Sequence, residues 1–201
     1  MTEDAGATAR GPYRAGRARQ EEILVAATQI FASDGYRGGS LRDVAKTLGV
    51  TPGAILHHFG SKEQLLVAVL ADRDEHSRDA VATFLEYNDT VGSLRAIVAD
   101  NEARPGLMRL FTTLAAEAVS PEHPAHVFFA ERYSRITTFI AEGLDREGFR
   151  SSSGASNAQI ASLVLATMDG LQLQWLMQPG FSMTAAFDVM LVSHGMLKVA
   201  E

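Results

Sequence analysis

The segment from Ser40 to Phe59 constrains the fold more than any other part of the chain, because two short amphipathic stretches flank a single glycine there. Ser40 is a favourable N-cap for the first stretch, LRDVAKTL, whose apolar residues share one helical face. Gly49 ends that stretch, since glycine takes the left-handed conformation at a helix C-terminus without a steric cost. Thr51 then caps a second stretch, with Pro52 in its first turn, where a missing N–H group does no harm. This arrangement predicts a helix-turn-helix.

Two functions fit such a pair of helices. One is an ordinary helical hairpin inside a bundle. The other is DNA binding, in which the start of the second helix, with its small residues, enters a major groove about 12 Å wide. The second stretch, PGAILHHF, has little apolar surface to bury beyond Ile55 and Phe59. A purely structural role explains it poorly, so the pattern favours DNA binding.

The rest of the chain has helical periodicity and no strand-like alternation, which predicts an all-α fold. An apolar stripe indicates a helix from about Arg17 to Gly35, and Ser61 caps a long helix from Lys62 to about Glu86. Further helices are expected near residues 91–102, 106–119, 124–147, 157–178 and 183–199. The predicted domains are a flexible basic arm (1–16), a three-helix DNA-binding head (17–62), and a helical body (63–201).

Composition excludes several classes of protein. The 201 residues include no cysteine, which excludes disulfides, cysteine-ligated zinc and thiol nucleophiles. No run of about eighteen apolar residues indicates a membrane span, so no membrane partner is expected. The N-terminal residues have arginines but lack the apolar block of a secretory signal. A cytoplasmic protein is expected.

The net charge of −6 is unevenly spread. Residues 1–62 carry eight Lys/Arg against six Asp/Glu, whereas residues 63–201 carry ten against eighteen. A mildly basic head on an acidic body is typical of a protein that meets DNA at one end, although a solvated arginine tail gives the same pattern. His123 and His126 have a spacing that can bind metal, but the neighbouring prolines disfavour a ligand helix, so no metal site is predicted. No GxSxG, P-loop or GxGxxG sequence is present, so we expect neither catalytic residues nor a cofactor.

The head resembles the TetR/AcrR family of bacterial regulators, and the match is long and specific over about residues 17–66. The residues that carry it are Phe31, Gly35, Tyr36, Ser40, Val44, Ala45, Gly49, Val50, Thr51, Phe59, Lys62 and Glu63. The segment from Met168 to Pro179 also looks like a penultimate helix common in this family. The resemblance implies a homodimeric repressor whose C-terminal body binds a small inducer.

The resemblance also implies which residues contact DNA. Ser40 and Thr51 would offer hydroxyl and N–H groups to phosphates at helix N-termini, and Lys62 would hold a phosphate at the start of its helix. Arg14 and Arg17 on the arm are expected in the adjacent minor groove. The recognition helix is expected to contribute Pro52, Gly53, Ala54, Leu56 and His57.

Two helices of the body, 157–178 and 183–199, are apolar on more than one face, which predicts a four-helix interface between two chains. A deeply buried monomer core is the alternative. The residues assigned to the interface are Leu165, Leu173, Leu176, Met190 and Leu197. Other apolar side chains are expected to line an effector pocket, although each fits a core role as well. They are Phe84, Leu107, Phe111, Phe128, Phe129, Tyr133, Met168, Gln172 and Trp175.

These features predict a ligand-responsive, homodimeric, DNA-binding transcriptional regulator. The expected form is a repressor released from a palindromic double-stranded DNA operator by a small, mainly hydrophobic molecule, neutral or weakly polar. The family usually has Thr and Tyr where this chain has Ala54 and Leu56, which cannot hydrogen-bond to bases. Sequence specificity is then expected to depend more on contacts to thymine methyl groups and on readout of DNA shape. The same departure leaves an alternative open: a helical ligand-binding or protein-interaction module with a weak or vestigial DNA-binding head.

Overall fold

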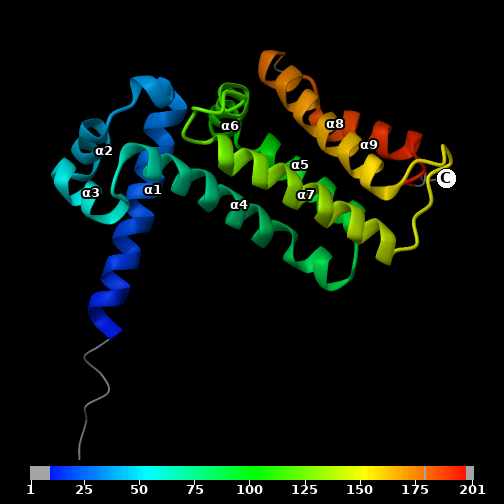
Figure 1. Cartoon of the computed structure of the whole chain (residues 1–201), viewed down its shortest axis with the longest axis horizontal. Coiled ribbons are helices and arrows are strands. Elements are labelled where there is room, and N and C mark those ends of the chain that lie inside the picture. Colours follow the sequence, from blue (N-terminus) through cyan, green and yellow to red (C-terminus); the bar gives the residue numbers. More distant parts are fainter. Residues whose placement is uncertain (1–9, 179, 198–201) are drawn as a thin grey trace, which may run out of the picture. The chain divides into compact units, whose positions relative to one another are not determined.

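The computed structural model describes residues 10–178 and 180–197 (Figure 1). Within these ranges the chain consists of helices and connecting turns, with no strand, which confirms the all-α fold. The helices are α1 (Arg10–Gly38), α2 (Leu41–Leu48), α3 (Pro52–Phe59), α4 (Lys62–Glu86), α5 (Thr90–Glu102), α6 (Pro105–Glu117), α7 (His126–Arg146), α8 (Asn157–Met177) and α9 (Met183–Ser193).

The chain divides into two compact units, and the division falls between Asp72 and Arg73, inside α4. The first unit contains α1, α2, α3 and the beginning of α4, and the second contains the rest of α4 and the helices that follow. The sequence places the domain change at residue 63, at the start of α4. Because α4 is one helix, both units share a continuous backbone element.

The two short helices have the caps that their sequences predict. Ser40 forms a capping box with Asp43, in which each side chain bonds to the other residue's backbone N–H. Gly49 has φ 65° and ψ 31°, the left-handed conformation that glycine adopts without strain. The Thr51 side chain accepts the N–H of Ala54 at 3.3 Å. These local contacts confirm the predicted ends of α2 and the start of α3.

The first unit is held together by apolar side chains from all four of its helices. Ile55, the buried residue of α3, has no exposed surface and fixes that helix against the unit's core. The other fully or nearly fully buried side chains are Ile23, Ala26, Ala27, Phe31, Val44, Ala45, Leu65, Leu66, Val69 and Leu70. The rest of α3 is free to present its opposite face to solvent.

Helix α1 is longer than the sequence indicates. It begins at Arg10, so residues 10–16 are helical and the prediction of a flexible arm over residues 1–16 is wrong for that part; residues 1–9 lie outside the described residues. Pro12 is tolerated because N–H groups in a first helical turn have no intrahelical acceptor. At the other end the helix continues past a kink at Gly35 (φ 73°, ψ 168°) to Gly38.

Gly39 gives a test of packing between α1 and α2. A Cβ there would lie 2.9 Å from both Ile30 Cγ2 and Phe31 Cδ1, and Phe31 is fully buried. Gly39→Ala is therefore expected to lower the free energy of unfolding by about 1–3 kcal/mol, measured by urea denaturation. Gly38→Ala is the control, because its Cβ would make only an ordinary 3.5 Å contact with Asp34 Cβ. Equal stability of the two variants would contradict this.

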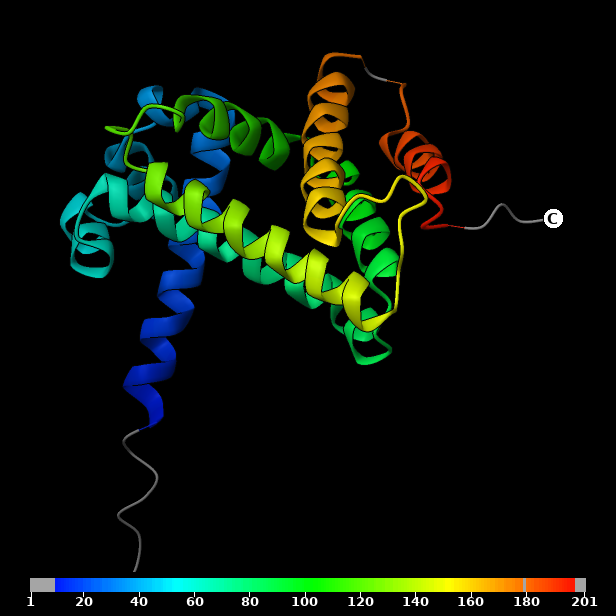
Figure 2. The same cartoon turned by 45° about the vertical axis from the view of Figure 1, so that its right-hand side comes forward.

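The second unit has its core where α5, α7, α8 and α9 meet, as Figures 1 and 2 show. Phe187 of α9 and Ile140 of α7 are fully buried there. The other buried members are Leu94, Val98, Leu144, Ile160, Ala161, Val164, Met183 and Leu191. Helix α8 packs against α6 as well as α7 and α9, so it is central to this unit.

Two helix ends in the second unit differ from the predicted ranges. Helix α9 ends at Ser193, although periodicity suggested residue 199, because Gly195 adopts φ 71° and the N–H of Met196 bonds to the carbonyl of Leu191 at 2.9 Å. This left-handed turn satisfies the last carbonyls and stops the helix. Helix α7 begins at His126, after the turn that contains Pro124.

Helix α8 is the one described helix that is long and apolar enough to cross a membrane by length and composition. One face of it packs inside the second unit, where it buries Ile160, Val164 and Gln172. The opposite face exposes Leu163, Leu173 and Met177. A helix that packs one apolar face into a protein core can have the same length and apolar composition as a membrane-spanning helix, so these two properties do not make α8 a membrane span.

Candidate nucleic-acid interface and effector cavity

Helix α3 presents a compact exposed face opposite Ile55. Gly53, Leu56 and His57 are all exposed and lie at i, i+3 and i+4, so they share that face. Leu56 is 41% exposed, so an apolar side chain forms part of this face. Thr51 is exposed at the N-terminus, and the backbone N–H groups of this first turn carry the positive end of the helix dipole. The arrangement suits contact with a polyanion.

Lys62 is positioned at the start of α4 by its neighbours. Its Nζ lies 4.5 Å from the centroid of the Tyr36 ring, a cation–π contact. The Tyr36 hydroxyl donates to Glu63 Oε1 at 3.2 Å, and burial together with the Glu63 charge raises the pKa of Tyr36 to about 12. The tyrosine is therefore a neutral donor at physiological pH. Lys62 keeps its ammonium close to the dipole-positive end of α4, where an anion would be favoured.

The remaining residues that the sequence assigned to DNA lie on α1, α2 and α3. The Ser40 hydroxyl is half-buried and bonded to Asp43, so its first role is to cap α2. Pro52 and Ala54 are half-buried in the first turn of α3. Arg17 is exposed on α1, and Arg14 lies in the same helix. Both arginines are on a helix rather than on the flexible arm that the sequence suggested.

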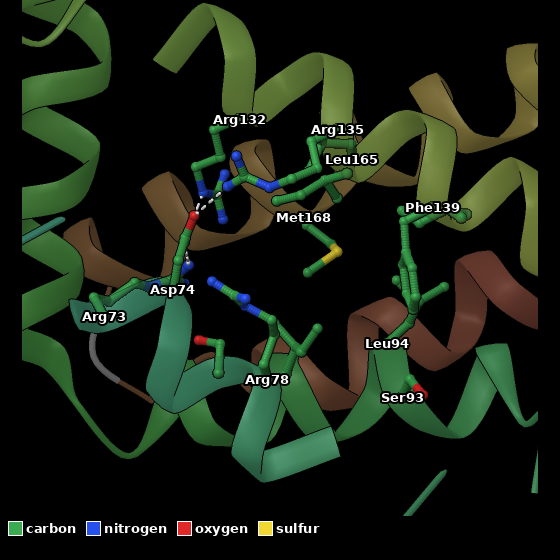
Figure 3. A pocket seen from close by; sticks show the side chains of 14 residues that line it. Arg73, Asp74, Arg78, Ser93, Leu94, Arg132, Arg135, Phe139, Leu165 and Met168 are labelled. Atoms are coloured by element: carbon green, nitrogen blue, oxygen red, sulfur yellow. Dashed lines mark hydrogen bonds and ion pairs between the residues drawn. The ribbon is translucent and has the colours of Figure 1, made fainter. Parts of the chain in front are cut away.

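The second unit contains a cavity of about 180 Å³ between the second half of α4 and helices α5, α7 and α8. Figure 3 shows that the cavity has two different ends. The guanidinium groups of Arg78 and Arg135 point towards the end that contains Asp74, whereas Phe139 and Leu94 lie at the other end. The lining residues are Arg73, Asp74, Ser77, Arg78, Ser93, Leu94, Ile97, Arg132, Arg135, Ile136, Phe139, Ile140, Leu165 and Met168.

Asp74 is the centre of the charged end. Its Oδ1 accepts from Arg73 Nη1 at 3.1 Å and from Arg132 Nε at 2.9 Å, and its Oδ2 accepts from Arg135 Nη2 at 2.9 Å. The side chains of Asp74, Arg73 and Arg132 are 7%, 5% and 7% exposed. One buried carboxylate therefore ties α4 to α7 through the two guanidinium groups of Arg132 and Arg135, while Arg73 is its neighbour on α4.

Two of these guanidinium groups also contact Phe111 of α6. The central carbons of Arg73 and Arg132 lie 4.5 and 4.6 Å from its ring centroid, and Phe129 packs against the same ring edge-on at 4.9 Å. Burial, followed by repulsion from Arg132, lowers the pKa of Arg73 to about 10. Arg73 consequently remains protonated at neutral pH, and the ring supplies part of the stabilisation that water has lost.

A second, separate cavity lies beside α6, α7 and α8. Tyr133 donates to Asp169 Oδ2 at 2.7 Å on its wall, and burial raises the pKa of Asp169. Gln172 is also on the wall. Its Nε2 donates to Thr112 Oγ1 at 2.6 Å, and its Oε1 accepts from Asn101 Nδ2 at 3.4 Å. Asn101 in turn accepts from Arg73 Nη2 at 2.8 Å. A buried polar chain thus connects α8 to the arginine cluster.

The residues predicted to line an effector pocket do not form one surface. Met168 alone lines the arginine-lined cavity, while Phe111, Tyr133 and Gln172 line the second. Phe111, Phe128 and Phe129 form an aromatic cluster, which is a packing role. Trp175 packs against the core of the second unit, and Phe84 and Leu107 are half-buried without lining either cavity.

The residues predicted for a dimer interface also divide. Leu173 is 43% exposed and belongs to the outer face of α8, together with Leu163 and Met177. Leu165 is buried and lines the arginine-lined cavity of its own chain. The others, Leu176, Met190 and Leu197, are partly buried, and the last two pack against the core.

Sequence reasoning missed the arginines that line the cavity beside α4, although one signal was available. Arg132 falls in the same helical register as Phe129, Ile136 and Ile140, so a charged residue occupies a position in an apolar stripe. A charge at such a position needs a buried partner, and Asp74 supplies it. His123 and His126, by contrast, do not gather metal ligands: the described residues contain no group of three potential ligands.

The helix-turn-helix, with its exposed recognition face, and the helical body, with its cavities, define a DNA-binding protein of the helix-turn-helix class with a separate body. Comparison with known proteins agrees. Residues 23–69 match the model of bacterial regulatory proteins of the tetR family, and residues 90–192 match that of the C-terminal part of BetI-type transcriptional repressors. The chain belongs to the TetR family and is a ligand-responsive, DNA-binding transcriptional regulator.

Individual relatives support this assignment. The HTH-type transcriptional repressor KstR2 of Rhodococcus jostii is 26% identical over 183 residues, in an alignment that covers 83% of each chain. The repressor AcnR of Corynebacterium diphtheriae is 37% identical over 84 residues, 42% of each chain. A TetR-family regulator from Agrobacterium tumefaciens has a crystal structure with the same fold, with a TM-score of 0.72, 22% identity, and coverage of 89% of this chain and 98% of that one. These relatives are regulators rather than enzymes.

Proposed function

We propose that the protein is a cytoplasmic homodimeric repressor that binds a palindromic operator and is released when a small molecule occupies the arginine-lined cavity. The observation that carries this proposal is the course of α4. The same helix begins with Lys62 and later contributes Arg73, Asp74, Ser77 and Arg78 to the cavity wall. A change at the cavity therefore acts directly on a helix that also begins in the DNA-binding head.

In this proposal the exposed face of α3 enters the major groove. Gly53, Ala54 and Leu56 meet base edges, with the leucine and alanine side chains against thymine methyl groups. His57 contacts a phosphate or a base edge. Contacts to the phosphate backbone fix the register of the protein on the duplex. They come from the N–H groups at the helix N-termini beside Ser40 and Thr51, from Pro52 in the first turn of α3, and from Lys62. Arg14 and Arg17, being on α1, would contact the backbone or the adjacent minor groove from a helix.

The proposed dimer uses the outer faces of α8 and α9. Leu163, Ala166, Gly170, Leu173 and Met177 recur every three or four residues, which places them in one stripe of α8. The large side chains of this stripe are exposed, and Val189 on α9 is 66% exposed. Two copies of each helix would form a four-helix interface that buries this stripe. A two-fold dimer also matches a palindromic site.

Selection of bound duplexes from random DNA by the purified protein, repeated at two salt concentrations, tests the operator proposal. A recovered palindrome with two half-sites is the expected result. Sequence-blind, salt-sensitive binding would contradict it and would favour the alternative of a body with a vestigial head, since Ala54 and Leu56 offer no hydrogen bonds to bases. The recovered duplex then serves as the probe for release by small molecules.

Lys62→Gln is expected to weaken binding to all sequences alike. A lost phosphate contact carries no sequence information, so affinity should fall at least about tenfold and the slope of log K against log salt should flatten by about one per half-site. Arg109→Gln is the matched control, because Arg109 is an exposed residue of α6 in the second unit and its loss removes the same charge. Both quantities are measured by fluorescence anisotropy. An unchanged salt slope would remove Lys62 from the interface.

A further inference from the structure

The arginine-lined cavity of about 180 Å³ contains more positive charge than its own residues neutralise. Four arginines line it against one carboxylate, that of Asp74. Both oxygens of Asp74 are already engaged by Arg73, Arg132 and Arg135. The buried Nε of Arg73, in addition, has no hydrogen-bond partner among the described residues. The charged end therefore has a surplus of cationic donors.

Two other carboxylates that act electrostatically on these arginines, Asp100 and Asp169, do not remove this surplus. Asp100 forms an ion pair with Arg104 at 2.9 Å, and Asp169 accepts a hydrogen bond from Tyr133. Neither of them lines the cavity. Clustered positive charge in a cleft attracts anions, so this end of the cavity favours an anion over a neutral or cationic molecule.

Arg78 and Arg135 are the two arginines that a ligand can reach. Arg78 is exposed and makes no ion pair with a described residue, and the Arg135 side chain is 56% exposed. Arg135 uses one nitrogen for Asp74, so its other donors stay available. Figure 3 shows both guanidinium groups directed into the charged end. Two convergent guanidinium groups suit a carboxylate or phosphate, which accepts paired, charge-assisted hydrogen bonds.

The other end of the cavity excludes a purely hydrophilic anion as the natural ligand. Its walls are the side chains of Leu94, Ile97, Ile136, Phe139, Leu165 and Met168. A volume of about 180 Å³ is roughly a dozen times what one water molecule needs. An apolar tail fills such a space with a gain of about fourfold in affinity for each buried methylene group.

We propose that this cavity binds an amphipathic anion, with a carboxylate or phosphate head at Arg78 and Arg135 and an apolar tail that reaches Phe139 and Met168. Its regulatory meaning rests on the proposed function above, whereas the binding chemistry rests on the cavity alone. The inference differs from the neutral or weakly polar effector that the sequence favours, because the arginines come from segments whose convergence only the fold reveals.

Isothermal titration of the full-length protein with four ten-carbon probes tests the chemistry of the head. Decanoate and decyl phosphate are the anionic probes, decan-1-ol is neutral, and decyltrimethylammonium is cationic. At least one anionic probe is expected to bind at least about tenfold more tightly than the alcohol, and the cation is expected not to bind. The preferred anion identifies the head group. Equal binding of the alcohol, tighter binding of the cation, or no binding of either anion would overturn the proposal.

Arg78→Gln tests the position of the head. It is expected to lower the affinity for the preferred anion by about 10- to 100-fold and to leave the affinity for decan-1-ol unchanged. Arg109→Gln carries the same charge change outside the cavity and should have no effect. Met168→Trp, which fills the apolar end, should weaken binding of the anion and the alcohol together. Equal effects of the two arginine variants would contradict the assigned head position.

Release of the selected operator separates this inference from the proposed function. If the preferred anion binds with the expected dependence on Arg78 but leaves the protein on DNA, the cavity chemistry holds and the regulatory proposal fails. If only a neutral or cationic molecule releases the operator, the regulatory proposal holds and the anionic ligand is wrong.

Discussion

Replacing Asp74 with alanine is expected to lower the free energy of unfolding by about 3–5 kcal/mol, because the change leaves buried guanidinium groups without their carboxylate. Arg73 and Arg132 each keep less than a tenth of their side-chain surface exposed, so water cannot replace the lost oxygens. Both cations also face the same Phe111 ring, where they repel each other once the carboxylate is gone. The expected loss of stability therefore exceeds that of three ordinary hydrogen bonds, because it includes the cost of leaving buried cations without a counter-charge.

The matched control is Asp188→Ala, which breaks the pair with Arg95. That pair has the same charges and a bidentate geometry, at 2.7 and 2.9 Å, but its side chains are 29% and 44% exposed. Exposed pairs contribute about 1 kcal/mol or less, because water solvates the partner that remains. Urea denaturation followed by circular dichroism measures both variants. Similar losses for Asp74 and Asp188 would show that the cluster is hydrated and that the description of a buried hub is wrong.

The DNA-binding head was predictable because its structure is encoded locally. The caps at Ser40 and Thr51 and the left-handed Gly49 act on backbone groups within four residues of themselves. Such contacts depend little on the rest of the chain. The end of α9 at Ser193 was missed although its cause, Gly195, is equally local, since apolar periodicity continued through the turn.

The effector cavity was not predictable in the same way, because its charged end joins distant segments. Asp74 and Arg132 are 58 positions apart, and Arg73 and Asn101 are 28 apart. Aromatic residues such as Phe111 and Phe129 were expected to line a ligand site, but they pack against each other. Composition identifies which side chains are apolar; it does not tell whether a cavity or a neighbouring ring lies beside them. The arginines decide the chemistry of the site, and their convergence is a property of the fold.

Leu173→Asp is expected to separate the proposed dimer and to lower operator affinity by roughly 100- to 10,000-fold, because a monomer meets only one half-site. Leu173 lies near the middle of the exposed α8 stripe and is 43% exposed within its own chain. A carboxylate there is solvated in the monomer but would be desolvated, opposite apolar side chains, in a four-helix interface. Light scattering gives the oligomeric state, and fluorescence anisotropy with the selected duplex gives the affinity.

Val127→Asp serves as the control, because Val127 is an apolar residue of α7 that is 62% exposed and lies outside the α8 stripe. It introduces the same charge and should leave both the oligomeric state and the affinity unchanged. Leu173→Asp should still give the far-ultraviolet circular dichroism of a folded helical protein, since its side chain does not belong to the core. If Leu173→Asp remains dimeric, the interface lies elsewhere. If it is monomeric yet binds the palindrome with full affinity, then recognition does not require two half-sites to be bound at once, and the proposal of a dimeric repressor on a palindromic operator fails.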